Sequence, residues 1–432
     1  MTLLKITKLW IPLALTWLMM SAEGPFLAAI VARMSEPKYN LAAFGIAFAF
    51  ALLTEAPIMM LLGASTVLSK DRKSYFKLRN FTFTLNLIIT IILLLIALPP
   101  IFKIIAVDMI GVEPNIAQIA NNAVLLLLPW PASIGFRRFY HGILIRNNQT
   151  VKIAITTISR ILIMATTAIS LYKLSYLKGA YIASIALSSA VLFESLFTRW
   201  IARKNISSLL NQKVTEDIKT PTYLEITKFY YPLALTPFIA ISAQPIITFF
   251  LAKSVYSLES LAIFPVVASF SFIFRSMGLS LHEIAIAKIG NNFENYSQIK
   301  LFSIILASVI TIVNVLVIFT FLGDIWFVDI SGLSEFLAGF AIIGSRIIFI
   351  LPALTVLISI QRAILITASQ TTPVGISTVI ELVGIIITIY LFVKLTSIPG
   401  IYAACFSFLV GRVAANIFLI YPINKIFKNR TC

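Results

Sequence analysis

Charged residues are scarce in this sequence, and their scarcity limits the possible protein classes. Only 12% of the 432 residues are charged, 59% are hydrophobic, and the mean hydropathy is +0.97. A soluble domain typically has about 25% charged residues and does not need so apolar a composition to fill its core. The composition therefore excludes a soluble globular protein and indicates an integral membrane protein.

Cysteine and histidine are also few, which limits the chemistry. The two cysteines, Cys405 and Cys432, have no metal-ligand spacing and no evident disulfide partner. The two histidines, His141 and His282, stand on separate hydrophobic runs. An enzyme would need a nucleophile with a base and an orienting group, or a metal cluster, and the sequence offers neither. We therefore predict no enzyme activity, no catalytic residue, no cofactor and no metal site.

Long apolar runs are abundant. A membrane-spanning helix needs about 20 mostly apolar residues, and none of the runs alternates with the ten-residue pattern of a membrane barrel strand. We predict an all-α integral membrane protein with twelve transmembrane helices. The runs are 9–34, 40–69, 81–106, 116–145, 150–173, 178–202, 223–252, 258–289, 299–323, 333–366, 371–394 and 398–422.

The formal charge of +17 follows the predicted topology. Basic residues cluster in loops after even-numbered runs, as in 69–79, whereas the opposite loops are sparse or acidic, as in 323–335. By the positive-inside rule, both termini are cytoplasmic. We therefore expect a multi-pass protein of the plasma (cell inner) membrane, monomeric and surrounded by membrane lipid, with no nucleic-acid partner.

The chain contains an internal duplication. Residues 6–16 read "ITKLWIPLALT" and residues 226–236 read "ITKFYYPLALT", with eight of eleven positions identical. Further matches follow at offsets of 220 and 221, such as "VDMIG" (107–111) and "VDISG" (328–332). An even number of helices in each copy makes the halves parallel repeats. We predict a six-helix lobe at 1–205, a cytoplasmic linker at 206–222 and a second six-helix lobe at 223–432.

Polar groups inside the predicted helices are the functional candidates, because they are costly in hydrocarbon and usually face a cavity or a partner. One set lies in cytoplasmic halves of helices and is expected to snorkel to the headgroups. It comprises Arg137, His141, Glu194, Arg362 and Arg412. The central set is expected either to act on substrate or to form fixed ion pairs between helices. It comprises Glu23, Glu55, Arg160, Arg275, Arg346 and Glu381.

Several motifs resemble a known transporter superfamily. The repeat with "PLALT" opening both halves resembles the multidrug/oligosaccharidyl-lipid/polysaccharide (MOP) exporter superfamily, whose best-known branch is the MATE drug exporters. The branch most similar is the progressive ankylosis (ANK) protein. Its similarity rests on "LAAFGIAFAF" (41–50), "SKDR" (69–72), "HGILI" (141–145), "QPII" (244–247) and "RIIF" (346–349).

The resemblance implies a MATE-like fold that exports its substrate by alternating access, coupled to H+ or Na+. The ANK branch implies small polyanions such as pyrophosphate, nucleotides or citrate. Glu23 matches the position at which MATE proteins place a coupling acid. The helices at 223–252 and 333–366 have an acid only near their first residues, Glu225 and Glu335, and lack the interior carboxylates that cation-coupling MATE proteins carry there.

The surplus of arginines favours a secondary transporter that exports a small organic or phosphate-bearing anion, because guanidinium forks recognise phosphate and carboxylate. The alternative is an H+- or Na+-coupled MATE-type multidrug exporter or a lipid-linked saccharide flippase. For substrate binding we propose Arg138, Arg160, Gln244, Arg275 and Arg346, and for proton or ion coupling Glu23, Glu55 and Glu381. We also predict that Glu55 and Arg275, equivalent at an offset of 220, pair in one conformation and separate in another.

Overall fold

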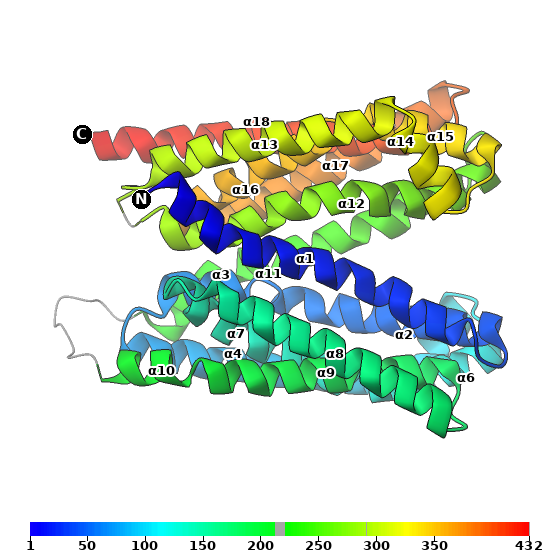
Figure 1. The fold of residues 1–432 in the computed structure, drawn as a ribbon, viewed down its shortest axis with the longest axis horizontal. Helices are drawn as coiled ribbons and strands as arrows, with labels where there is room; N and C mark the ends of the chain where they lie inside the picture. The colour runs from blue at the N-terminus through cyan, green and yellow to red at the C-terminus, as the bar shows by residue number, and fades with distance from the viewer. Residues whose placement is uncertain (212–220, 291, 432) are drawn as a thin grey trace. The chain divides into compact units, whose positions relative to one another are not determined.

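The structure is a computed structural model that describes residues 1–211, 221–290 and 292–431 (Figure 1). In these ranges the chain is helical apart from one isolated β-bridge between Val255 and Pro399. Eleven helices are long and apolar enough to cross a membrane, and the bent pair α15 and α16 makes up to twelve. This confirms the predicted all-α fold of membrane-spanning helices.

The chain divides into two compact units. The first unit is Ile11–Tyr230, and the second unit is Met1–Trp10 together with Tyr231–Cys432. Up to the predicted linker, the elements are α1 (Leu3–Val31), α2 (Pro37–Glu55), η1 (Ala56–Ile58), α3 (Leu61–Leu68), α4 (Arg72–Ile96), α5 (Pro99–Lys103), η2 (Ile104–Met109), α6 (Pro114–Leu126), α7 (Pro129–Arg146), α8 (Thr150–Leu174), α9 (Gly179–Ile201) and α10 (Arg203–Leu210).

After the linker, the elements are α11 (Tyr223–Leu251), α12 (Ser257–Lys288), α13 (Tyr296–Phe319), α14 (Leu322–Asp324), η3 (Ile325–Ile330), α15 (Glu335–Ile347), α16 (Leu351–Thr367), α17 (Thr372–Leu395) and α18 (Gly400–Thr431). The predicted linker 206–222 begins inside α10, and its residues 212–220 lie outside the described part of the chain.

Three predicted spans are each divided into two helices, and a proline stands at each break. Pro57 lies in the short 3-10 segment η1 between α2 and α3, Pro129 is the first residue of α7, and Pro352 is the second residue of α16. Proline has no backbone N–H to donate and clashes with the preceding turn, which favours a break there, although α11 continues through Pro232, Pro237 and Pro245. At the third break α15 and α16 meet at an angle of 40°.

Helix α4 begins nine residues before the predicted start of its span. Asp71 accepts a hydrogen bond from the Ser74 N–H at 2.9 Å, and the Ser74 hydroxyl lies 3.0 Å from the Asp71 N–H, which forms a capping box. The basic stretch predicted to be a loop therefore lies in the first turns of α4. Hydropathy alone missed this start because the first turns are polar.

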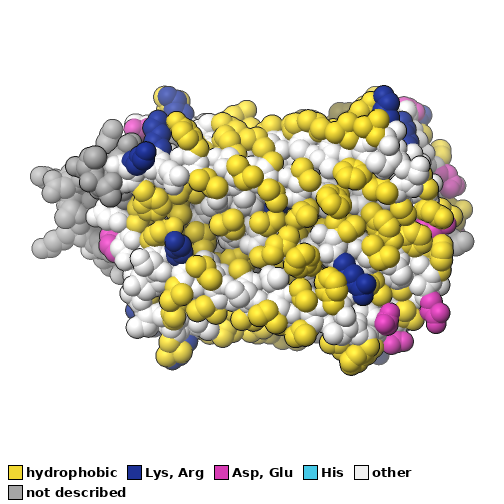
Figure 2. All heavy atoms as spheres, turned by 90° about the horizontal axis from the view of Figure 1, so that it is seen from above, with side chains coloured by type: hydrophobic (Ala, Val, Ile, Leu, Met, Phe, Trp, Pro, Cys, Tyr) yellow, Lys and Arg dark blue, Asp and Glu magenta, His cyan; other side chains and the backbone are white. Residues whose placement is uncertain are grey.

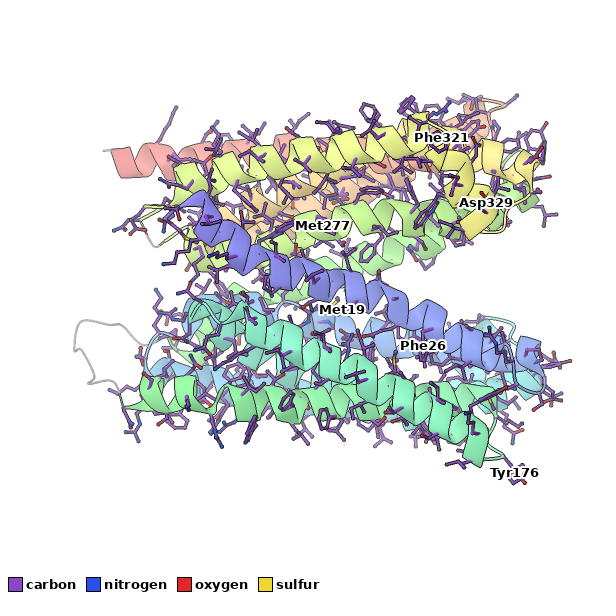
Figure 3. All side chains as sticks on the ribbon, in the orientation of Figure 1. Met19, Phe26, Tyr176, Met277, Phe321 and Asp329 are labelled. Atoms are coloured by element: carbon purple, nitrogen blue, oxygen red, sulfur yellow. The ribbon has the colours of Figure 1, made fainter. Side chains whose placement is uncertain are left out.

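The backbone repeats along with the sequence. The π-helical segments η2 and η3 occupy equivalent positions, and each contains the aspartate of its motif, Asp108 or Asp329 (Asp329 is labelled in Figure 3). Left-handed backbone conformations recur at the same offsets of 220 or 221. These pairs are Glu36 and Tyr256, Gly111 and Gly332, and Asn148 and Ser369. Because residues other than glycine rarely adopt positive φ, their recurrence indicates a shared local structure.

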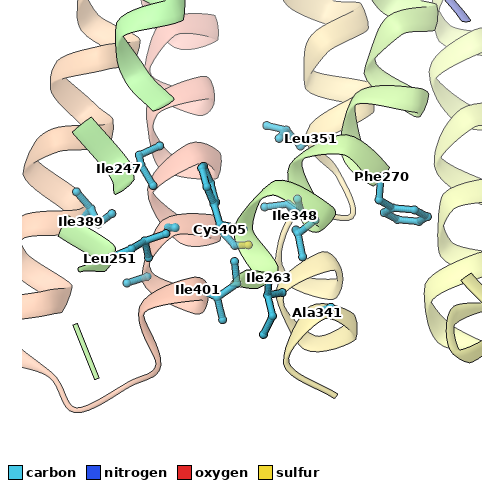
Figure 4. Close-up of a cluster of buried hydrophobic side chains, with 14 of the residues drawn as sticks. Ile247, Leu251, Ile263, Phe270, Ala341, Ile348, Leu351, Ile389, Ile401 and Cys405 are labelled. Carbon is cyan, nitrogen blue, oxygen red and sulfur yellow. The ribbon is translucent and has the colours of Figure 1, made fainter. Parts of the chain in front are cut away.

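Apolar side chains fill the interior of the second unit and also lie on its outer surface. A buried cluster draws Ile247 from α11, Phe270 from α12, Ala341 from α15, Ile389 from α17 and Cys405 from α18 (Figure 4). Hydrophobic side chains also cover most of the face drawn in Figure 2. An apolar exterior over an apolar core is the composition that a lipid surround requires.

Helix α1 begins in the second unit, because Met1–Trp10 belongs to it and Ile11 onward does not. The Trp10 indole donates a hydrogen bond to the Met277 carbonyl oxygen of α12 at 3.3 Å (Met277 is labelled in Figure 3). The Trp10 ring also packs edge-on against Phe302 of α13, with centroids 5.7 Å apart. Trp10 therefore fixes the first turns of α1 to the second unit.

Helix α11 does the reverse, since its first residues up to Tyr230 belong to the first unit. The Tyr230 hydroxyl donates a hydrogen bond to the Pro57 carbonyl oxygen at 2.5 Å, and its ring packs against Phe81 of α4 at 5.4 Å. All three positions lie 220 or 221 residues from those of the Trp10 contact. We call residues 1–10 and 223–230 the exchanged helix starts.

Candidate functional site

Four charged side chains meet inside the first unit, and we call them the N cluster: Glu23, Arg137, Arg160 and Glu194. Arg137 Nη1 lies 2.7 Å from Glu194 Oε2, and Arg160 Nη1 lies 3.4 Å from the same oxygen. Arg160 Nη2 also pairs with Glu23 Oε1. Thr157 donates to Glu194 Oε1 at 3.1 Å. Two arginines and two glutamates therefore balance each other.

The N cluster is closed. The side chains of Arg137 and Arg160 are each 3% exposed, that of Glu194 is 0% exposed, and only Glu23 reaches 12%. The prediction that Arg137 and Glu194 snorkel was wrong, because each finds an opposite charge within the bundle. His141 is also buried, with its Nε2 3.4 Å from the hydroxyls of Thr156 and Thr198.

Glu55 and Arg138 lie beside the N cluster. Both are buried, and the charge of Arg138 acts on Glu55 more strongly than any other charge. No hydrogen bond or ion pair of either side chain occurs within the described ranges. Glu55 belongs to the first unit and Arg275 to the second, so their predicted pairing stays a prediction.

The second unit holds a different group, which we call the C cluster: Arg275, Arg362, Glu381 and Arg412. Arg412 contacts Glu381 Oε1 twice, through Nη2 at 2.7 Å and Nε at 2.8 Å. Arg362 Nη2 lies 3.7 Å from Glu381 Oε2. Arg412 Nη1 also donates to the Thr355 hydroxyl at 3.0 Å. Glu381 thus lies between two guanidinium groups.

Arg362 and Arg275 complete the C cluster from α16 and α12. Arg362 donates to the hydroxyls of Ser377 at 3.3 Å and Thr378 at 2.9 Å. Arg275 is half-buried and its charge acts on both Glu381 and Arg412. The Nε atoms of Arg275 and Arg362 are buried without a hydrogen-bond partner in the described part of the chain. These two groups therefore retain unused hydrogen-bonding capacity.

Close helix packing brings the C cluster together. A Cβ on Gly411 would lie 2.5 Å from the Glu381 carbonyl oxygen, so only glycine lets α18 approach α17 at this level. A Cβ on Gly278 would lie 3.0 Å from the Val356 nitrogen, which shows a similar approach of α12 to α16. The residue after Gly411 is Arg412, and Arg275 lies one turn before Gly278.

The C cluster differs from the N cluster in charge and in access. Three arginines surround one glutamate, which leaves two uncompensated positive charges. The exposed fractions are 17% for the Arg362 side chain, 13% for Glu381 and 11% for Arg412. The prediction that Arg362 and Arg412 snorkel was wrong as well, since Glu381 holds them. Sequence reasoning missed these two as candidate binding residues because their helix positions suggested the headgroup region.

Two other predicted substrate residues lie apart from both clusters. Gln244 is on an exposed face of α11, and no hydrogen bond of its side chain occurs in the described ranges. Arg346 is exposed on α15, donates from Nε to the Ile318 carbonyl oxygen at 2.9 Å and lies over the Phe319 ring at 5.0 Å. Arg138, Arg160 and Arg275 are the predicted substrate arginines that lie in or beside a cluster.

Solved structures share this arrangement of helices. The MATE in the bent conformation aligns with a TM-score of 0.78 over 99% of this chain and 97% of that one, at 17% identity. The Vibrio cholerae MATE transporter VcmN in the bent form aligns with a TM-score of 0.78 over the same shares, at 14% identity. This chain has the MATE fold.

A MOP superfamily transporter from Pyrococcus furiosus Vc1 has the same fold, with a TM-score of 0.77, 16% identity, and coverage of 99% of this chain and 96% of that one. It is described as having a binding pocket of reverse polarity, which suggests a different function for it. No protein-family model and no curated protein matches the sequence.

The MATE fold confirms the predicted fold class. The solved structures that share it include a multidrug resistance MATE family transporter of the MOP superfamily. The resemblance to the ANK branch stays a prediction. Among the described residues, no group of three or more His, Cys, Asp or Glu side chains is arranged to hold a metal ion.

Proposed function

We propose that this protein is a secondary active transporter that exports a small organic or phosphate-bearing anion. The C cluster carries the proposal, because its three arginines exceed its one glutamate by two charges. Uncompensated charge at membrane depth is costly and is retained where it contacts a substrate, an ion or water. A drug-cation exporter would instead need a surplus of carboxylates at its site.

The MATE fold supports the same proposal. In two-lobe transporters of parallel repeats, one lobe rocks against the other around a site near the midplane. The reverse polarity of the Pyrococcus furiosus transporter is a precedent for a binding pocket of unusual charge on this fold. We propose that the protein works as a monomer in the plasma membrane, with both termini in the cytoplasm.

The test is a flux measurement in liposomes that contain the purified protein. Radiolabelled pyrophosphate and citrate are compared with a cationic dye under H+ and Na+ gradients. Gradient-driven movement of an anion, without movement of the dye, is the expected result. Movement of the dye alone would establish the alternative, an H+- or Na+-coupled multidrug exporter, and a lipid-linked saccharide flippase would move neither probe.

For coupling, Glu23 is the strongest of the three proposed acids. It lies on α1, its side chain is 12% exposed, and its partner Arg160 is shared with Glu194. Protonation of Glu23 would therefore free one side of Arg160 without leaving that arginine unpaired. Glu55 and Glu381 are the other two candidates.

The Glu23→Gln protein is expected to fold and insert but to lose transport driven by a pH gradient, because glutamine cannot exchange a proton. Flux is measured with and without the gradient at matched protein content. The Glu113→Gln variant, at an exposed site outside the cluster, is the control and should transport normally. If Glu23→Gln retains gradient-driven flux of every anion tested, Glu23 has a structural role.

A further inference from the structure

We propose that the C cluster is a binding site for a soluble dianion and that Glu381 is a built-in competitor for it. The inference rests on the proposed function and names the site and the charge of the substrate. The structure supplies three supporting features, which are the charge count, the unused donors and the access to the cluster.

The charge count selects a dianion. Arg275, Arg362 and Arg412 carry three positive charges and Glu381 carries one negative charge, so two negative charges on a ligand bring the cluster to neutrality. A monoanion would leave one charge uncompensated in a low-dielectric region, where such charges are costly. A phosphate ester, sulfate or dicarboxylate at neutral pH meets this requirement.

The donors are suited to an oxyanion. The Nε atoms of Arg275 and Arg362 have no hydrogen-bond partner within the described ranges, and guanidinium groups bind carboxylate and phosphate oxygens in parallel pairs. Thr378 and Ser377 already orient Arg362, so its guanidinium is held in place before a ligand arrives. Arg275 has no ion-pair partner in the described part of the chain and is the group most free to receive the anion.

Glu381 occupies the place that an anion's oxygen would take. It contacts Arg412 at 2.7 Å and Arg362 at the longer distance of 3.7 Å. An incoming anion therefore displaces Glu381 most easily from Arg362, while Arg412 keeps both its contacts to Glu381 and its hydrogen bond to Thr355. In this arrangement Glu381 compensates one of the three positive charges when the site is empty and weakens the binding of every anion.

The N cluster supports the assignment by contrast. It has the same residue types and equal charges of both signs, and three of its four side chains are almost fully buried. Its arginines have no surplus charge to offer, and its carboxylates already accept from them. Anion binding is thus expected in the second unit alone.

The test measures binding without transport. The purified full-length protein is titrated with sulfate and with pyrophosphate by calorimetry, and nitrate at equal ionic strength is the monoanion control. Sulfate is expected to bind more tightly than nitrate. The Arg275→Gln protein should bind sulfate about tenfold to a hundredfold more weakly, the range for losing a hydrogen bond to a charged group. The Arg33→Gln variant, at an exposed site in the turn after α1, should bind as the wild type does.

A second variant separates binding from scaffolding. Glu381→Gln removes the competitor, so sulfate should bind roughly tenfold more tightly, as expected for removing a nearby like charge. A purely structural Glu381 predicts weaker binding instead, and that result would overturn the proposal. Unchanged sulfate binding in Arg275→Gln, or equal binding of nitrate and sulfate, would overturn it as well.

Two further outcomes distinguish the sources of failure. A lipid phosphate shares the chemistry of a soluble dianion, so displacement of sulfate by phosphatidate but not by the soluble dianion glycerol 3-phosphate refutes a soluble ligand. Intact sulfate binding without anion flux in liposomes refutes the proposed transport function and supports the site. Anion flux with unchanged binding in Arg275→Gln refutes the site and supports the transport function.

Discussion

The two units differ in how the charges inside their helices are compensated. Each contains a glutamate between two arginines: Glu194 between Arg137 and Arg160, and Glu381 between Arg362 and Arg412. Glu194 is completely buried, and a second acid, Glu23, completes the balance. Among the described residues no second acid acts on Glu381, whereas a further arginine does, and the Glu381 side chain is 13% exposed.

The difference indicates which cluster holds helices together and which cluster can bind a ligand. A balanced, closed ion-pair network holds helices together, and breaking it leaves an uncompensated buried charge. A cluster with uncompensated charge raises the free energy of the folded protein in the membrane, unless a ligand or water contacts that charge. Three substitutions test this contrast, and their expected effects decrease in the order given.

Glu194→Gln should have the largest effect. It leaves Arg137 without an acidic partner in a fully buried place, so the free energy of unfolding should fall by about 3–5 kcal/mol. The measurement is unfolding of the detergent-solubilised protein by denaturant. Glu113→Gln in the same unit is the matched control and should change the stability by less than about 0.5 kcal/mol. A loss below about 1 kcal/mol for Glu194→Gln would contradict the structural role of the N cluster.

Glu381→Gln should cost less than Glu194→Gln, because Glu381 is not completely buried and the glutamine oxygen can still accept a hydrogen bond from Arg412, which is worth about 1 kcal/mol. Its arginines retain hydroxyl partners in Thr355 and Thr378. Sulfate should raise the unfolding temperature of this variant more than that of the wild type, because a ligand that binds the folded state stabilises it. The same sulfate should not restore the Glu194→Gln protein. Equal rescue of both variants would remove the distinction between the clusters.

Trp10→Phe and Tyr230→Phe should have the smallest effects, about 0.5–1.5 kcal/mol each, the net value of one hydrogen bond. Tyr230→Phe keeps the ring and removes only the hydroxyl donor, whereas Trp10→Phe removes the N–H donor together with part of the indole. Both variants are expected to lose stability, since the two units agree in these contacts. A loss confined to one of the two variants, measured by the same unfolding assay, would show that the contacts are not equivalent.

The helices of this fold could be predicted from sequence because each span must be long and apolar. Proline does not predict the helix breaks by itself, because the chain breaks at Pro57, Pro129 and Pro352 but α11 continues through Pro232, Pro237 and Pro245. The early start of α4 was not predicted, because its capping box lies in a basic stretch that hydropathy assigns to a loop. Hydropathy therefore predicted the spans but not their exact ends and breaks.

The ion pairs were beyond sequence analysis. A sequence shows that Arg137 and Arg412 lie on helices, but the partner depends on which faces pack and how closely. The approach of α17 to α18 depends on Gly411, whose missing side chain gives no signal of a nearby charge. Snorkelling was therefore predicted for residues that pair inside the bundle. The repeat comes nearest, since Arg160 and Glu381 lie 221 residues apart, at equivalent positions with opposite charge.

The exchanged helix starts are equivalent in the two halves. Both contacts of Trp10 recur at Tyr230, with the same partner positions shifted by 220 or 221 residues. In a chain made of two equivalent halves, such an exchange has the form of a domain swap, in which two copies trade an identical element.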